Sequence, residues 1–461
     1  MDTIYKKIAD IVGSNYVSNA AEELYIYSRD QGVQPARLPD YVVMPNSTEE
    51  VQKIVALANK EKIPIVPMGG ALVLSGLTIP QRGGIVLDMK RMNRILEVNE
   101  KSHYAVVEAG TSQGMLQAYL KKHHPKLKHS VPDAPPVATI GGNIAIHGSG
   151  HLSQSEGGFH TEMVTGLEVV LASGEAVKLG SCSTVPKWFS RAPIPDLAGL
   201  FMGWNGTTGV ITKIGLKLFP SPKLKDVMMF MTEDVDSITD ILFRIIDTEM
   251  AEDIAFFVSP KPAYFEGYQL IMISVVANSE KEMKLRLELI RESVREYIDS
   301  KEAGFLPLPP YMKVKLVGAP QKNLSEFADV MKGGGFEYVG AIMPVESIPE
   351  AYRAGLEITS KHDITYSMGA RIVGRGSCVM FYYAYPFNRA DSKNIETVAK
   401  ALEETNEKAL EIGGIPWKTE ISGQQLILER MEPGTYKMMT EIRKLLDPNG
   451  IMNPGNWEVQ S

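Results

Sequence analysis

Cysteine is scarce in this sequence of 461 residues, which contains only Cys182 and Cys378. Two thiols are too few to hold an iron–sulfur cluster, which usually takes four, and they form no CxxC redox motif. A disulfide scaffold is disfavoured for the same reason. If the protein transfers electrons, any iron–sulfur cluster must therefore sit on a partner.

Long apolar runs, basic clusters and the common nucleotide signatures are also missing. No stretch has the roughly 20 apolar residues of a membrane span, and the N-terminal MDTIYKKIADIVG lacks the apolar core of a signal peptide, so we expect a cytoplasmic protein without an integral membrane segment. The net charge of −7 argues against a nucleic-acid partner. The sequence contains no P-loop Gly-Lys-Ser/Thr, and no GxGxxG opens a helix, which disfavours the usual mononucleotide and nicotinamide sites.

The composition that is present is typical of a globular protein with two or three domains: 44% of the residues are apolar and 22% are charged. A capping-box pattern, Ser47 followed by Glu50, predicts a helix that leads into the apolar strand IPIVP. GLEVVLASGEAVKLG predicts a hairpin that turns at Ser173-Gly174. PSPKLKD marks a boundary near residue 222, and beyond it strands alternate with amphipathic helices near 279–300, 347–361 and 391–412.

Three loops of small residues adjoin apolar strands. They are found in IPIVPMGGALVLSG (63–76), PDAPPVATIGGNIAIHGSG (132–150) and NGTTGVITKIG (205–215). Glycine lets backbone N–H groups approach a ligand closely, and successive N–H groups form a concavity that binds anions. Taken singly, each loop is more readily a tight turn; together, the three could cradle a pyrophosphate.

The order of these motifs resembles the FAD-linked oxidase family, that is, the vanillyl-alcohol oxidase / para-cresol methylhydroxylase superfamily with its glycolate oxidase and D-lactate dehydrogenase branch. The resemblance runs through YVVMPNSTEEVQKIVALANKEKIPIVPMGG, ATIGGNIA, GLEVVLASGEAVKLG, DLAGLFMGWNGTTGVITKIGLKLFP and the tail LDPNGIMNPG. It implies an α+β fold with a two-lobed PCMH-type FAD-binding domain over residues 1–222. An α+β cap domain with an antiparallel sheet would follow over 223–415, and a C-terminal segment, 416–461, would return to the FAD domain.

The resemblance also implies a set of FAD contacts in the three loops and the tail. The first loop departs from the family's PRGxGTxLSG at three positions, so backbone groups would carry the phosphate there. Because this loop has no His or Cys and no His follows His362, we predict noncovalent FAD; a tyrosyl link stays open. The residues expected to contact FAD are Pro67, Met68, Gly69, Gly70, Ala71, Leu72, Ser75, Pro132, Thr139, Gly142, Asn143, Gly209, Val210, Ile211 and Asn453.

The substrate side departs further from the family. Its hydroxyacid dehydrogenases typically carry HxGDGN and GEHG motifs, where this sequence reads GARIVGRGSC and PWKTEISG. Both histidines are missing, and imidazole serves there in metal ligation and proton abstraction, so we expect no metal site. The candidates that remain on this side are Arg371, Arg375, Tyr382, Tyr383, Tyr385, Trp417, Lys418 and Glu420.

Four catalytic residues are predicted from these candidates and from EGGFHTEMVTG. Arg371 could clamp a substrate carboxylate, and Tyr383 could take or hold a hydroxyl proton. Glu420 or His160 could be the base. Three of them have an ordinary alternative: a surface ion pair for Arg371, a strand position for Tyr383, and a structural hydrogen bond for His160. His147 and His151, which flank a glycine loop, carry the same ambiguity.

The function favoured by the sequence is an FAD-dependent dehydrogenase that oxidises a hydroxylated small molecule, with a 2-hydroxy acid first, by hydride transfer to flavin N5. One alternative substrate is a phenol or benzylic alcohol, whose ring the cap aromatics could stack. Another alternative is a flavoprotein subunit that passes electrons to an iron–sulfur or electron-transferring flavoprotein partner. A non-redox use of FAD, as in alkylglycerone-phosphate synthesis, and a homo-oligomeric assembly are left open.

Overall fold

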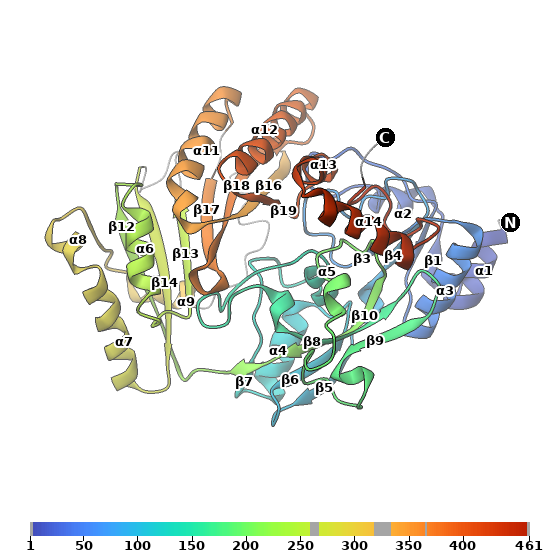
Figure 1. The fold of residues 1–461 in the computed structure, drawn as a ribbon, viewed down its shortest axis with the longest axis horizontal. Coiled ribbons are helices and arrows are strands. Elements are labelled where there is room, and N and C mark those ends of the chain that lie inside the picture. Colours follow the sequence, from blue (N-terminus) through green and yellow to red (C-terminus); the bar gives the residue numbers. More distant parts are fainter. Residues whose placement is uncertain (1–2, 259–266, 318–332, 365–366, 459–461) are drawn as a thin grey trace.

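The structure is a computed structural model that describes residues 3–258, 267–317, 333–364 and 367–458. Figure 1 shows two halves side by side: the chain up to about residue 222 together with the C-terminal helices, and a second half built on one large sheet. Helices and strands occur in both halves, which confirms the α+β class. Every residue predicted for the site lies within the described ranges.

The first half begins with a four-stranded sheet in the order β1 (Val17–Ser18), β2 (Tyr41–Val43), β4 (Ile85–Asp88) and β3 (Ile65–Met68), in which the last three strands run parallel. Helices α1 (Thr3–Val12) and α3 (Thr48–Glu61) pack against it, and the short α2 (Ala21–Ile26) lies between them in sequence. The capping prediction for α3 is confirmed, since Ser47 Oγ accepts a hydrogen bond from Glu50 N at 3.2 Å. Strand β3 ends where the first glycine-rich loop starts.

A second, five-stranded antiparallel sheet completes this half. Its order is β5 (Ile95–Asn99), β6 (Tyr104–Glu108), β10 (Val210–Lys217), β8 (Val164–Val170) and β9 (Ala176–Gly180). The hairpin β8–β9 turns at Ser173-Gly174 as predicted, with Gly174 at φ 86°. Helices α4 (Gln113–His123) and α5 (Ile140–Ala145) flank the sheet, and β7 (Leu127–Lys128) pairs with β11 (Phe219–Pro220).

The second half is an eight-stranded antiparallel sheet. Its order is β15 (Ala303–Phe305), β12 (Leu224–Thr232), β14 (Gln269–Ala277), β13 (Asp253–Val258), β17 (Ser367–Val373), β18 (Cys378–Asn388), β16 (Gly334–Met343) and β19 (Ile415–Trp417). The antiparallel cap sheet expected from the sequence is thus confirmed. The division of the chain at residues 222 and 415 stays a prediction, and β19 runs across the second of these positions.

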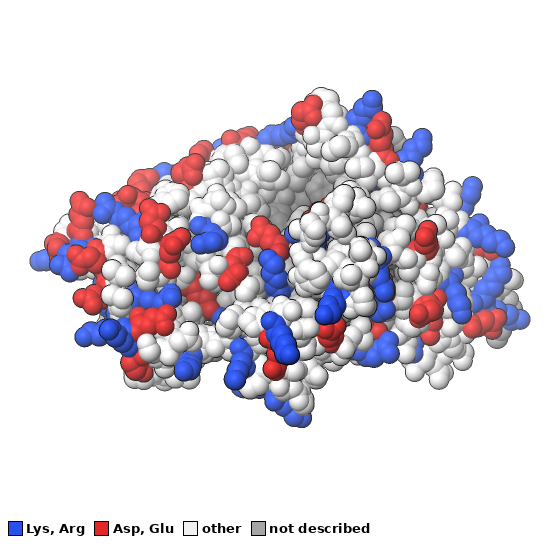
Figure 2. Space-filling model, turned by 60° about the horizontal axis from the view of Figure 1, so that its bottom comes forward, with Lys and Arg blue, Asp and Glu red and all other residues white. Residues whose placement is uncertain are grey.

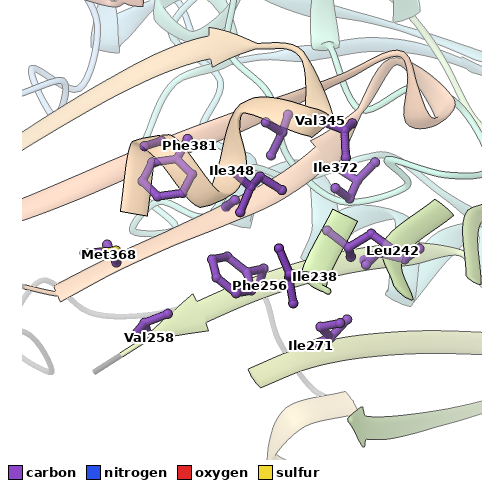
Figure 3. Close-up of a cluster of buried hydrophobic side chains, with 14 of the residues drawn as sticks. Ile238, Leu242, Phe256, Val258, Ile271, Val345, Ile348, Met368, Ile372 and Phe381 are labelled. Carbon is purple, nitrogen blue, oxygen red and sulfur yellow. The ribbon is translucent and has the colours of Figure 1, made fainter. Parts of the chain in front are cut away.

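The core of the second half lies on one face of this sheet. Helices α6 (Ile238–Ile246), α7 (Glu280–Ser293), α11 (Ile348–His362) and α12 (Ser392–Glu411) cover that face, while α8 (Arg295–Asp299) follows α7. Figure 3 shows Ile238 of α6 beside Phe256 of β13, in a cluster that also holds Ile271 and Phe381. Because strand side chains alternate, Ala255 and Phe257 face the opposite side, toward the site and α9 (Pro310–Val317).

The C-terminal segment folds back on the first half. After α13 (Ile421–Arg430) and α14 (Pro433–Leu446), the carboxylate of Asp447 accepts hydrogen bonds from the N–H groups of Ile451 and Met452 and turns the chain. The tail then pairs with β3, where Asn453 N donates to Ile65 O at 2.7 Å. Within the described ranges, none of the helices is long and apolar enough to cross a membrane. Lys and Arg intermix with Asp and Glu over the face in Figure 2.

Candidate active site

A cavity of about 340 Å³ lies between the loops of the first half and the eight-stranded sheet. One wall consists of the three glycine-rich loops. The opposite wall is built by β13, β14, β16, β17 and β18, by Leu316 of α9, and by Trp417 and Lys418 at the end of β19. Both halves of the chain therefore contribute to one site.

The first loop forms its wall largely with backbone. Pro67, Met68, Gly69, Gly70, Ala71 and Leu72, all predicted from the sequence, line the cavity. A Cβ on Gly69 would lie 2.0 Å from Thr139 Oγ1 of the second loop, so a larger residue there would require Thr139 to move. Ala71 has a left-handed backbone, with φ 51°. The predicted Ser75 is buried outside the wall, where its Oγ donates to Val73 O at 3.4 Å.

The second loop contributes the predicted Pro132, Thr139, Gly142 and Asn143. Thr139 caps α5, and its Oγ1 accepts a hydrogen bond from Gly142 N at 3.3 Å. These contacts hold the loop against the first one and fix where its backbone faces the cavity.

His160 lies behind Asn143 rather than on the main wall. Its Nδ1 is 2.5 Å from Asn143 Oδ1 and its Nε2 is 2.9 Å from Ser130 Oγ, beside a separate cavity of about 20 Å³. Burial lowers the pKa of His160 to about 3, so the imidazole is neutral at pH 7. In this position His160 orients Asn143, one of the residues expected to contact FAD.

The third loop and the tail meet beneath the cavity. Gly209 and Ile211 line it, whereas the side chain of the predicted Val210 packs into the core beside β3. Asn453, also predicted, supports the wall from below: its Nδ2 donates to Leu77 O at 3.1 Å and to Asn205 O at 2.6 Å. The tail thus joins two of the loops that face the cavity.

The loop wall fits FAD by two further observations. A Cβ on Gly141 would lie 2.7 Å from Ala109 O, so backbone rather than side chain forms the surface there too. Ser149 Oγ is buried in the wall with no hydrogen-bond partner in the described part of the chain, which leaves a hydroxyl for a bound ligand. Backbone N–H groups in such loops suit a pyrophosphate.

Arg371 reaches the cavity but is already paired. Its Nη1 donates to Asp253 and its Nη2 to Asp133, and His151 lies 3.0 Å from Asp133 and 3.5 Å from Asp253. Burial alone would raise the pKa of Asp133, but the charge of Arg371 and the hydrogen bonds from His151 and Arg371 outweigh burial and lower it. We call Arg371, Asp133, Asp253 and His151 the ion-pair cluster. It joins the second loop to β13 and β17.

Aromatic side chains form much of the sheet wall. Tyr338 and Tyr382 stack with ring centroids 5.0 Å apart, and Trp417 Nε1 donates to His147 O at 3.0 Å across the two halves. Burial raises the pKa of Tyr382 to about 12, with Asp133 adding to the shift, so this tyrosine stays protonated at pH 7. Phe257, Met272, Phe336 and Met380 also line this wall.

Tyr383 and Glu420, predicted as catalytic, do not line the cavity. Tyr383 points into the core of the second half, where its hydroxyl donates to Ala351 O at 2.6 Å. Glu420 is buried at the start of α13 and accepts hydrogen bonds from Asn406 Nδ2 and Thr419 Oγ1; burial raises its pKa. Of the other candidates, Tyr385 is buried with its hydroxyl 2.8 Å from Thr405 Oγ1, and Arg375 is exposed.

Sequence reasoning missed Asp133, Asp253 and Tyr338. Asp133 lies inside PDAPP, where a carboxylate among prolines of a ligand loop was a usable signal. Tyr338 and Asp253 sit on strands with no local signal, since their partners come from distant parts of the chain. Among the residues the structure describes, no group of three or more His, Cys, Asp or Glu side chains could hold a metal ion.

The glycine-rich loops, the facing sheet and the cavity between them define a flavoprotein with the PCMH-type architecture. The solved structure of p-cresol methylhydroxylase with substrate bound superposes with a TM-score of 0.85 at 19% identity, covering 98% of this chain and 96% of that chain. The FAD binding domain family matches residues 39–180, and the C-terminal domain of FAD linked oxidases matches residues 332–457. The chain belongs to the FAD-linked oxidase family, and it is an FAD-dependent oxidoreductase.

Two relatives match nearly end to end. Glycolate oxidase subunit GlcD of Bacillus subtilis (strain 168) is 27% identical over 98% of this chain and 96% of its own length. D-lactate dehydrogenase of Anaerostipes hadrus is 26% identical over 94% of this chain and 91% of its own. The family recognised in the sequence is thereby confirmed, and so is FAD as its cofactor.

Proposed function

We propose that the protein oxidises a 2-hydroxy acid in the cavity between the glycine-rich loops and the sheet. The observation that carries this proposal is the imidazole–carboxylate pair on the cavity wall, His151 and Asp133, 3.0 Å apart. A hydroxyl group must lose its proton when its carbon is oxidised, and an imidazole beside a carboxylate is suited to accept it. The relatives named for glycolate and D-lactate support the same substrate class.

The glycine-rich loops would hold FAD, which when bound would supply the hydride acceptor for the oxidation. The chain supplies the rest of the chemistry. His151 takes the hydroxyl proton, and Asp133 holds the imidazole in place and stabilises its charged form. The ion-pair cluster fixes both groups, because Arg371 binds Asp133 and Asp253 at once. The apolar side chains of the sheet wall keep water from the reacting carbon.

Anaerobic bleaching of the flavin absorbance tests this proposal. Glycolate and both enantiomers of lactate, 2-hydroxyglutarate and 3-phenyllactate are mixed with the purified holoenzyme, and at least one should reduce the flavin. His151→Gln should retain FAD but bleach at least about 100-fold more slowly, because general base catalysis contributes about 10²–10⁴-fold. Bleaching at the wild-type rate in this variant would assign the proton to another group.

A second candidate substrate, a phenol or benzylic alcohol, is favoured by the stacked Tyr338–Tyr382 pair. An aromatic ring could lie against this pair without any need for a carboxylate partner. The same assay with 4-methylphenol and 4-hydroxybenzyl alcohol separates the two candidates. Bleaching by these compounds, with none by the acids, would replace the first proposal with the second.

The electron acceptor is a separate proposal. A flavoprotein subunit that passes electrons to an iron–sulfur or electron-transferring flavoprotein partner accords with a chain of two cysteines. Copurification from the native source tests it, since a lone flavoprotein that turns over with no partner would contradict it.

A further inference from the structure

Lys418 is a cation on the cavity wall with no anionic partner among the described residues. It follows β19 directly and has a left-handed backbone, with φ 56°, which a lysine adopts at a cost. Its Nζ lies 3.6 Å from the centroid of the Trp417 ring. Across the described ranges, its ammonium group makes no hydrogen bond or ion pair, although it lines the cavity and remains partly accessible.

The surroundings of Lys418 disfavour its charge while the cavity holds no anion. Burial lowers its pKa to about 7, and the more distant charge of Asp133 opposes this shift only in part. An anion that entered the cavity would restore the charged form and provide the missing partner. A charge-assisted hydrogen bond in such a site is stronger than one in water.

Arg371 is less suited than Lys418 to bind a substrate carboxylate, because two carboxylates already balance its charge. Its two terminal nitrogens are engaged by Asp133 and Asp253, so one guanidinium already faces two carboxylates. A substrate carboxylate at Arg371 would be the third anion there and would be repelled. Lys418 is thus the unpaired cation among the described residues that line the cavity.

An aromatic surface extends from Lys418 along the sheet. Gly340 of β16 lies opposite both Tyr382 of β18 and Trp417 of β19. A Cβ at Gly340 would lie 3.4 Å from the Trp417 ring and 3.5 Å from the Tyr338 ring, so these two rings border the space above the glycine. Together with the stacked Tyr338–Tyr382 pair, they form a continuous apolar wall that starts at the lysine.

We propose that Lys418 binds the carboxylate of a 2-hydroxy acid whose side chain is aromatic or otherwise bulky and apolar and lies against Tyr338 and Tyr382. This assignment rests on the function proposed above and names both the carboxylate partner and the class of side chain. It transfers to Lys418 the role that the sequence suggested for Arg371. A small polar hydroxy acid would leave the aromatic wall uncovered and would bind less tightly.

The test is calorimetric binding of 3-phenylpyruvate and pyruvate to the oxidised holoenzyme. These 2-oxo acids resemble the products, and binding is measured without turnover. If only the charged lysine binds, a pKa of about 7 predicts about 30-fold weaker binding of 3-phenylpyruvate at pH 8.5 than at pH 6.0. We expect pyruvate to bind at least about tenfold more weakly than 3-phenylpyruvate at pH 6.0, because it has no ring to bury.

Three variants make the test specific, and the flavin content of each is checked by its absorbance. Lys418→Met should lose at least about tenfold in affinity at pH 6.0 and depend less on pH than the wild type. Lys418→Arg should bind at both pH values, because a guanidinium stays charged. Lys301→Met is the matched control: Lys301 also has a left-handed backbone, φ 64°, but is exposed and lies outside the cavity, so wild-type binding is expected.

The failures are distinguishable. Wild-type affinity in Lys418→Met would overturn the assignment of Lys418 and leave the hydroxy-acid proposal standing. Equal affinities for pyruvate and 3-phenylpyruvate would overturn the proposal that the substrate has an aromatic or bulky apolar side chain. If neither acid binds the wild-type holoenzyme while a phenol does, both the assignment and the hydroxy-acid function are wrong.

Discussion

Replacing Gly69 with alanine should weaken FAD binding through a specific collision between two loops. The new Cβ would lie 2.0 Å from Thr139 Oγ1, far inside contact distance. Thr139 could rotate its hydroxyl away only by giving up the cap on Gly142 N. Overpacking of this kind costs about 1–3 kcal/mol, and if the strain falls on the bound state, FAD binds about 5- to 150-fold more weakly.

A double-mutant cycle isolates this collision. Thr139→Gly removes both the hydroxyl and the Cβ that the introduced methyl group would meet, while glycine as an N-cap costs only about a few tenths of a kcal/mol. Gly69→Ala should therefore be far less harmful in the Thr139→Gly background, with a coupling energy of about 1–3 kcal/mol. Gly199→Ala serves as the control, because no atom of the described residues beyond its immediate chain neighbours lies within 4 Å of the Cβ that it would add.

The assay is FAD affinity from the quenching of flavin fluorescence on binding to apoprotein, together with urea unfolding of each apoprotein. Unfolding is needed because the strain can appear as lost stability instead of lost affinity. Additive effects of the two substitutions in both measurements would refute the reasoning. So would a Gly69→Ala protein that behaves like Gly199→Ala.

Four further results are expected. Asp253→Asn breaks half of a buried pair with Arg371 and should cost about 3 kcal/mol of unfolding free energy at pH 7. Burial alone would raise the pKa of Asp253, but the charge of Arg371 outweighs burial and lowers it. The contribution of Asp253 to stability is therefore present above about pH 3.9 and is lost as the pH falls. Urea unfolding should show a smaller difference between the wild type and Asp253→Asn at pH 3 than at pH 7. The pKa of His160 is about 3 in the folded protein and about 6.5 in the unfolded chain. As the pH falls between these values, the wild type should therefore lose about 1.4 kcal/mol of unfolding free energy per pH unit, a loss that His160→Gln should not show. Equal slopes of stability against pH for the two proteins would contradict this. Tyr383→Phe should lose about 1 kcal/mol of unfolding free energy at unchanged KM, because its hydroxyl donates to the core carbonyl of Ala351 and the side chain does not line the cavity. Acid precipitation should leave yellow flavin in the supernatant if FAD is noncovalent, whereas a yellow pellet would indicate a covalent link.

The parts of the fold that the sequence predicts are those set by neighbours along the chain. The cap of α3 depends on Ser47 and Glu50, three residues apart, and the β8–β9 turn on Ser173 and Gly174. The glycine-rich loops likewise carry their signal locally, because a backbone that approaches a ligand needs glycine at the point of contact. Most of the predicted FAD contacts therefore line the cavity. The exceptions are Ser75 and Val210, whose neighbours face it instead, and Asn453, which supports the wall from below.

The substrate side was harder because its geometry depends on strand register. Tyr382 and Tyr383 are adjacent, and alternation requires them to face opposite sides of β18, but the sequence does not say which one faces the site. The pairing decides it: Tyr382 lies opposite Gly340 and Gly369, whose missing side chains leave it room, while Tyr383 lies opposite Val339 and Met368 of the core.

The role of Arg371 was beyond sequence reasoning for a related reason. Its partners, Asp253 and Asp133, lie 118 and 238 residues away, and they come from opposite halves of the molecule. An arginine on a strand near a ligand site looks like a free clamp until both carboxylates are in place. Once they are, the guanidinium holds the second loop against the sheet, and the one cation left to meet a substrate anion on the described wall is Lys418. The same contacts that join the halves thus also decide which charge the cavity presents to its substrate.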